Sequence, residues 1–184
     1  AITDEDARQE ALLEAQYEQW RNKAISDPYE PGSVFKIITA SAVLEEKVVG
    51  LNNSFTCTGS YESGGVVYHC WKLAGHGTQN FAQTLQNSCN PAFISYGQAL
   101  GKEKFREYFQ AFGLTQTTGI DLPGEAGSIY HAEEDFGVTE LSSSSFGQTF
   151  KVTALQLITA VSAAVNGGEL MQPYIVKQVV DEEK

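Results

Sequence analysis

Near its start the sequence reads Glu30-Pro31-Gly32-Ser33-Val34-Phe35-Lys36-Ile37-Ile38-Thr39-Ala40, with one lysine in an otherwise apolar run, three residues after a serine. Nothing from Ile37 to Leu44 is charged, so this stretch predicts a helix that is buried on most sides. A buried ammonium without a partner is costly, and a chain keeps one where its chemistry needs it. The Ser-x-x-Lys spacing therefore indicates a serine nucleophile that a lysine activates.

Ser33 and Lys36 are one helical turn apart and share a face of the predicted helix, which runs from about Ser33 to Lys47. At a helix start, free amides and the helix dipole stabilise negative charge, and one amide can form half of an oxyanion hole. Burial should lower the pKa of Lys36, so that the neutral amine can take the serine proton. The alternative is that Ser33 only caps the helix and Lys36 extends to water.

Length and charge restrict the classes of protein to which the chain can belong. Its 184 residues suffice for one domain with a core, and the 42% apolar content argues against disorder. The net charge of −11 predicts solubility and disfavours nucleic acid as a partner. No apolar run approaches the roughly 20 residues that span a bilayer, and no signal-peptide pattern opens the chain. We expect any anchor or export signal to lie outside it.

The patterning predicts a mainly helical chain with a small β-hairpin region. An N-cap at Thr3 begins a first helix to about Ile25, with Leu13, Tyr17 and Trp20 at helical spacing. Further helices are predicted at about 80–86, 91–101, 102–112 and 153–166, the last one buried. A hairpin or paired short strands are predicted at 54–72 around Gly64-Gly65. A long loop that includes four serines is predicted at 115–145, and a strand at 173–180.

A second candidate group is Ser88-Cys89-Asn90, just before a helix that Pro91 would open. A serine hydroxyl and an asparagine amide two residues apart can relay a proton and hold a substrate amide. The alternative is that Asn90 is simply the cap of the helix that follows.

A third candidate group contains soft metal ligands with one tryptophan among them: Cys57, His69, Cys70, Trp71, His76 and Cys89. Cys57, Cys70 and His76 could bind zinc, although the spacing matches none of the common closed zinc motifs. We therefore assign no metal and favour a disulfide or plain buried thiols. Cys70–Cys89 and Cys57–Cys70 are the disulfide pairs to consider, and the first would give a redox control on the Ser88 loop.

Taken together, five segments resemble the transpeptidase domain of class B penicillin-binding proteins, the division and sporulation enzymes. The segments are Asn22 to Lys36, Gly75-His-Gly-Thr78, Ser88-Cys-Asn90-Pro-Ala-Phe93, Thr118-Gly-Ile-Asp-Leu-Pro-Gly-Glu125 and Ser145-Phe-Gly-Gln148. They occur in the order and spacing of the family, and the resemblance covers about residues 22–180. It implies the helical part of the α+β fold that penicillin-binding proteins share with serine β-lactamases, with the central sheet largely missing from this chain.

The resemblance also implies roles for individual residues. Ser33 would attack the D-Ala-D-Ala carbonyl of a peptidoglycan stem peptide, with Lys36 as the base. Ser88 would relay a proton, and Asn90 would orient the substrate amide and the lysine. Trp71 and Cys89 would line the substrate cleft. The acyl-enzyme would pass to an amine of a neighbouring stem peptide, and β-lactams would acylate the same serine.

One departure from the family pattern limits what the chain can do alone. Neither Lys-Thr-Gly nor Lys-Ser-Gly occurs in it, although in the family that third motif completes the oxyanion hole. We therefore expect residues 1–184 to be one partial transpeptidase domain, truncated at both ends and nearly inactive by itself. The resemblance implies no cofactor. It implies cell-wall synthesis partners such as a glycosyltransferase, and a place on the extracytoplasmic face of the bacterial membrane through an anchor outside this chain.

Three other functions remain open at this point. A serine β-lactamase has a related fold, but the residues before Ser33 and after Ser88 look like the transpeptidase version. A non-catalytic β-lactam sensor would keep the acyl group and signal. A helical scaffold could retain the motifs without using them. The rate of deacylation separates the lactamase, and loss of penicillin binding on Ser33→Ala would exclude the scaffold.

Overall fold

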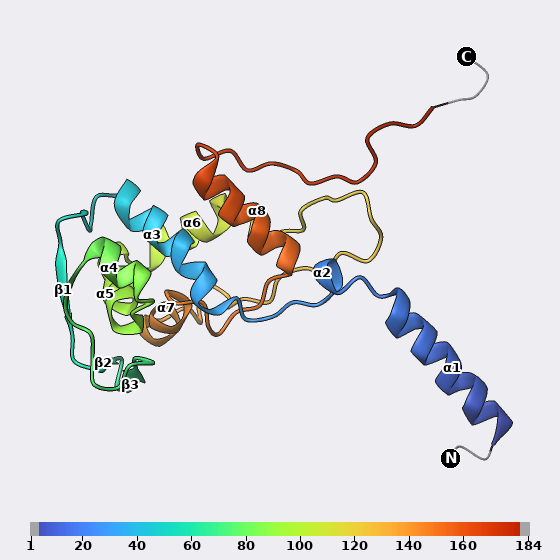
Figure 1. The fold of residues 1–184 in the computed structure, drawn as a ribbon, viewed down its shortest axis with the longest axis horizontal. Helices are drawn as coiled ribbons and strands as arrows, with labels where there is room; N and C mark the ends of the chain where they lie inside the picture. Colours follow the sequence, from blue (N-terminus) through green and yellow to red (C-terminus); the bar gives the residue numbers. More distant parts are fainter. Residues whose placement is uncertain (1–3, 181–184) are drawn as a thin grey trace.

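The computed structural model describes residues 4–180, which form a helical body with two small sheets on one side (Figure 1). In chain order the elements are α1 Glu5–Trp20, α2 Lys23–Ser26, the 3-10 helix η1 Gly32–Phe35, α3 Lys36–Glu45, β1 Ser54–Cys57, β2 Ser60–Ser63, β3 Val66–His69, β4 Gly77–Asn80, α4 Phe81–Gln86, α5 Asn90–Leu100, α6 Lys102–Ala111, α7 Val138–Ser144 and α8 Ala154–Val165. The mainly α architecture with a small β region is therefore confirmed.

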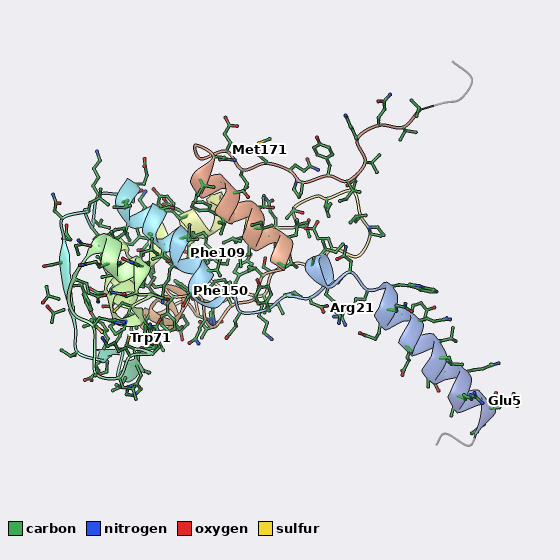
Figure 2. The ribbon with its side chains drawn as sticks, in the orientation of Figure 1. Glu5, Arg21, Trp71, Phe109, Phe150 and Met171 are labelled. Carbon is green, nitrogen blue, oxygen red and sulfur yellow. The ribbon has the colours of Figure 1, made fainter. Side chains whose placement is uncertain are left out.

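The core surrounds α3, which packs against α5, α6 and α8. Phe35, at the end of η1, is 1% exposed, and its ring centroid lies 5.9 Å, 6.0 Å and 4.8 Å from those of Phe105, Phe109 and Phe150. Figure 2 shows Phe109 and Phe150 inside the helical body. Because Phe35 directly precedes Lys36, aromatic packing anchors the segment that carries the serine and the lysine.

The two sheets are both antiparallel pairs. β2 and β3 form the predicted hairpin, with Gly64 and Gly65 at φ +58° and +77°, as a tight two-residue turn requires. β1 pairs instead with β4, so that Cys57 lies opposite Gly77. The strand pairing predicted within 54–72 was therefore wrong for β1, because its partner β4 begins at Gly77, beyond that range.

The N-terminal helix projects from the body and buries none of its residues (Figure 1). Thr3, the predicted cap, lies outside the described residues, and the side chain of Asp4 caps α1. The helix ends at Trp20 rather than near Ile25, because Asn22 caps the separate helix α2. The apolar side chains that the spacing placed on one face are exposed to solvent.

Residues 115–145 are largely irregular, but they contain the helix α7, and all four serines of 142–145 are buried at its C-terminal end. Helix α8 begins with a capping box of Thr153 and Gln156. Its burial was overestimated, since Ile158 and Val165 are exposed. Only one face of α8 therefore packs on the body.

Residues 173–180 do not form the predicted strand. No neighbouring strand pairs with them within residues 4–180, and a strand without a partner leaves its backbone groups unsatisfied. The amides of Ile175 and Val176 instead donate hydrogen bonds of 2.7 Å each to the carboxylate of Asp121. This contact holds the C-terminal tail against the 115–145 segment.

Candidate active site

The loop before α3 is held by the segment of residues 145–149. Gly32 has φ +56°, and its amide donates to the Gly147 carbonyl at 2.9 Å. A Cβ on Gly147 would lie 1.9 Å from the carbonyl oxygen of Gly32, so only glycine permits this approach. The Thr149 amide donates to Glu30 at 2.9 Å, and the Thr39 hydroxyl donates to the Ser145 carbonyl at 2.9 Å. Hydrogen bonds to residues 145–149 therefore hold the chain both before and after Ser33.

Ser33 and Lys36 have opposite environments. Ser33 lies in η1 with its side chain exposed and caps no helix, whereas Lys36 opens α3 and is 1% exposed. The Lys36 ammonium donates to Ser33 Oγ at 3.1 Å. The alternative of a capping serine and a lysine that extends to water is therefore wrong.

Three further acceptors surround the Lys36 nitrogen. Nζ lies 2.9 Å from both the hydroxyl and the carbonyl oxygen of Ser88, and 2.6 Å from Asn90 Oδ1. It also lies 5.6 Å from the centroid of the Phe93 ring. The structure thus brings four of the predicted residues to one point, although more than 50 positions separate the two motifs.

Burial at this point makes Lys36 easier to deprotonate than an exposed lysine. Burial lowers the pKa of Lys36 to about 8, because desolvation disfavours the ammonium form, while Cys89 and Cys70 nearby act in the opposite direction. Near neutral pH a usable fraction of the amine is then neutral. A neutral amine at 3.1 Å can accept the proton of the Ser33 hydroxyl.

The geometry of Ser88 and Asn90 follows from an unusual backbone. Ser88 has φ +49°, which is uncommon for a residue other than glycine, and this turn points both its carbonyl and its hydroxyl at Lys36. Asn90 is the first residue of α5, and Cys89 holds the cap position. The Asn90 amide nitrogen donates to the His69 carbonyl at 3.3 Å. Asn90 is thus no helix cap, contrary to that alternative.

The two residues expected to line the substrate cleft behave differently. Trp71 is 66% exposed, and its indole N–H donates to the Asn87 carbonyl at 2.9 Å, directly before Ser88. It thus lies on the surface beside the candidate site. Cys89 is 0% exposed, so its thiol cannot line a cleft, and we correct that assignment.

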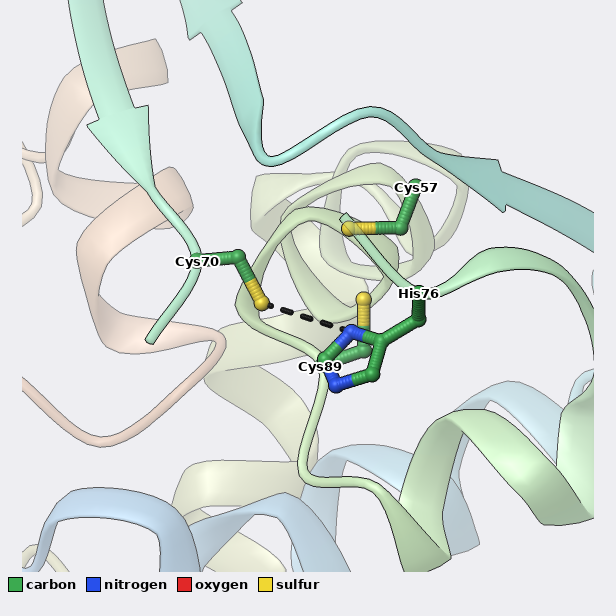
Figure 3. Close-up of side chains that lie close together, drawn as sticks. All are labelled: Cys57, Cys70, His76 and Cys89. Atoms are coloured by element: carbon green, nitrogen blue, oxygen red, sulfur yellow. Dashed lines mark hydrogen bonds between the residues drawn. The ribbon is translucent and has the colours of Figure 1, made fainter. Parts of the chain in front are cut away.

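Cys57, Cys70 and His76, the three residues considered as zinc ligands, lie close together, and the buried Cys89 joins them. The ligand atoms of Cys57, Cys70, His76 and Cys89, hereafter the Cys3His cluster, all lie within 4.8 Å of one another (Figure 3). All three cysteines are free thiols in this structure. Burial raises the pKa of the Cys89 thiol to about 12, so without a metal it stays protonated.

Some supporting contacts escaped the sequence analysis. The Glu30–Thr149 hydrogen bond and the Gly32–Gly147 contact join segments more than 100 positions apart. The signal that could have found them is the glycine within Ser145-Phe-Gly-Gln148, since such a glycine often marks a close approach of two backbones.

Comparisons with known proteins give the family and the fold of the chain. The family model "Penicillin binding protein transpeptidase domain" matches residues 2–184. Stage V sporulation protein D of Bacillus subtilis is 48% identical over 162 residues, which are 88% of this chain and 25% of that protein. Penicillin-binding protein 3 of Mycobacterium tuberculosis complexed with aztreonam superposes with a TM-score of 0.79 at 32% identity, over 85% of this chain and 35% of that one.

A further solved structure is a complex between penicillin-binding protein PBP2 and MreC of Helicobacter pylori. It gives a TM-score of 0.80 at 26% identity, over 93% of this chain and 34% of the matched chain. The chain thus spans about a quarter of the length of the curated relative with 48% identity.

Proposed function

The chain belongs to the penicillin-binding protein transpeptidase family, and from that membership we propose that it supplies the nucleophile wall of a peptidoglycan D,D-transpeptidase. The observation that carries the proposal is the position of Lys36 Nζ, within hydrogen-bond distance of Ser33, Ser88 and Asn90 at once. Such a constellation joins a nucleophile, a base and two groups that orient them.

In the acylation step Ser33 attacks the carbonyl carbon between the two D-alanines of a stem peptide. Lys36 takes the hydroxyl proton as Ser33 Oγ bonds to the carbonyl carbon, and the carbonyl oxygen becomes an oxyanion. The backbone amide of Ser33 provides one of its donors. The exposure of Ser33 and the burial of Lys36 support this division of roles.

Collapse of the tetrahedral intermediate breaks the peptide bond and releases D-alanine. The amine that leaves needs a proton, and Ser88 relays it from Lys36, since its hydroxyl lies 2.9 Å from Nζ. Asn90 holds the lysine through Oδ1. An amine of a second stem peptide then attacks the acyl-serine, restoring the Ser33 hydroxyl and forming the cross-link. A β-lactam would acylate Ser33 in the same way and remain bound.

The remaining substrate-binding groups come from polypeptide that these 184 residues do not include. The absence of Lys-Thr-Gly and Lys-Ser-Gly from the sequence supports this view, as does the quarter of its relative's length that the chain spans. Residues 1–184 are on this proposal one partial domain, with Trp71 beside the cleft. Alone, they would react with substrate slowly or not at all.

Partners and location follow from the same proposal. Peptidoglycan synthesis takes place outside the cytoplasmic membrane, and we propose that the complete protein acts there with other cell-wall proteins. The PBP2–MreC complex of a structural relative supports an assembly of this kind. From the family we also expect a glycosyltransferase among these partners. Within residues 4–180, no helix is both long and apolar enough to span a bilayer.

The test is covalent labelling of Ser33 by a fluorescent penicillin in the complete protein that carries this chain. We expect one label per molecule, located on the Ser33 peptide by mass spectrometry, and slow release of the acyl group. Ser33→Ala should abolish labelling, and Lys36→Met should slow it by roughly 100-fold or more. Labelling that persists in Ser33→Ala would overturn the proposal, and rapid turnover of the penicillin would favour a β-lactamase instead.

A further inference from the structure

The Cys3His cluster lies beside the candidate active site and has no role in the mechanism above. Cys57 ends β1, Cys70 follows β3, His76 precedes β4, and Cys89 precedes α5. Figure 3 shows the three sulfur atoms and the imidazole ring of His76 turned toward one common point. Side chains from four separate segments thus converge.

The distances within this cluster suit a tetrahedral zinc ion. With Zn–S bonds of about 2.3 Å and Zn–N bonds of about 2.0 Å, neighbouring ligand atoms lie about 3.5–3.8 Å apart. The separation between Cys70 Sγ and His76 Nδ1 is 3.5 Å, and every other pair lies within 4.8 Å. Small side-chain rotations would bring all four atoms into bonding distance. Three thiolates and one imidazole form one of the ligand sets that structural zinc sites use.

The burial of the cluster indicates a closed site rather than a catalytic one. Cys57, Cys70 and Cys89 are 2%, 1% and 0% exposed, which leaves no open position for a water ligand. The exposed Trp71 packs against the His76 ring in an edge-to-face arrangement, at a centroid distance of 5.2 Å. The zinc would therefore hold structure and take no part in the acyl transfer.

A disulfide explains the same residues less well. One disulfide would join two sulfur atoms and leave the third thiol and the imidazole buried without a function. The convergence of all four ligand atoms is what a metal requires. We propose that the Cys3His cluster binds one structural zinc ion. On binding, each thiol releases its proton to the solvent, and no oxidant or reductant takes part.

The zinc site would fix the segment that carries Ser88 and Asn90. Cys89 lies between them in the chain, and its amide donates to the Thr84 carbonyl at 2.9 Å. A bond from zinc to the Cys89 sulfur would tie this turn to both small sheets, since Cys57 ends β1 and Cys70 directly follows β3. The ion would thereby keep the two acceptors in place around Lys36.

The first experiment measures metal content in the 184-residue chain, purified under reducing conditions with zinc supplied and then dialysed. We expect one zinc per chain by elemental analysis. Cobalt substitution should give thiolate charge-transfer bands and the strong visible bands of a tetrahedral site. Cys57→Ser and His76→Gln should each weaken zinc affinity by more than about 100-fold, beyond the loss typical of an outer-shell change. His69→Gln is the matched control, because His69 is exposed, and it should bind zinc normally.

A second measurement uses the unmodified chain, in case a variant does not fold. If opening of the Ser88 turn releases the metal, free zinc at 100 times Kd should slow hydrogen exchange of the Ser88 and Cys89 amides about 100-fold. Exchange in α8, which supplies no ligand, should not change. A chain without stoichiometric zinc, equal affinity in Cys57→Ser, or a Cys70–Cys89 disulfide that forms in the presence of zinc would each overturn the proposal.

Discussion

Replacement of Gly147 by alanine should destabilise the protein through the turn that holds Ser33. Gly147 has φ +91°, and left-handed backbone costs an L-residue about 1–2 kcal/mol. The new Cβ would also lie 1.9 Å from the Gly32 carbonyl oxygen, so the two backbones must separate. Separation breaks the 2.9 Å hydrogen bond from the Gly32 amide to Gly147, worth about 1 kcal/mol. The expected total is about 2–3 kcal/mol of unfolding free energy.

Gly167→Ala is the matched control, because Gly167 has φ +99° and a Cβ there would meet nothing within 4 Å. It carries the same backbone cost and the same gain from a stiffer unfolded chain, but no steric clash. Urea denaturation followed by circular dichroism should show Gly147→Ala to be less stable than the control by at least about 1 kcal/mol. In the complete protein, only Gly147→Ala should slow the acylation of Ser33. Equal stabilities of the two variants would refute the reasoning.

Three further predictions concern single side chains. If the pKa of about 8 for Lys36 governs the reaction, the acylation rate of the complete protein should rise about tenfold per pH unit and level off above pH 8, where the amine has lost its proton. A rate that stays constant between pH 6 and 8 in stopped-flow labelling would contradict this. Asn90→Leu keeps the side-chain volume but removes the 2.6 Å acceptor, so acylation should fall about 100-fold, whereas loss of the cooperative melting transition would mean that the residue is mainly structural. Asp121→Asn leaves one acceptor oxygen, so at least one of the two tail amides that donate to Asp121 should exchange its hydrogen faster, and unchanged exchange of both would show that the contact holds nothing. These two hydrogen bonds lower the pKa of the Asp121 carboxyl, so in the unmodified chain the protection should persist above the ordinary carboxyl pKa and disappear as the pH falls through the lowered value.

The sequence predicted the residues of the site better than their surroundings. Ser33 and Lys36 are three positions apart, so local helical geometry brings them together whatever the rest of the chain does. Their contact with Ser88 and Asn90 was expected only through the resemblance to the transpeptidase family. No periodicity in the sequence joins positions so far apart, and the structure shows the contact as an outcome of packing between α3 and α5.

The errors have a common physical cause. The pairing of β1 with β4 and the irregular tail at 173–180 depend on whether a partner strand lies alongside, which alternation within a segment does not reveal. The assignment of Cys89 to a cleft failed for another reason. The positive φ of Ser88 turns the next side chain inward, and a single sequence gives no sign of such a backbone at a serine.

Ser88, Cys89 and Asn90 alternate in direction, with the outer two side chains at Lys36 and the middle one in the Cys3His cluster. This alternation makes the length of the tripeptide as important as its composition. An inserted or deleted residue would reverse the directions of these side chains. The thiol would then point at Lys36, and a hydroxyl or an amide would point at the sulfur atoms of the cluster. Among natural variants we therefore expect gaps and insertions to collect in the exposed turn at 71–74, and to be absent between positions 88 and 90.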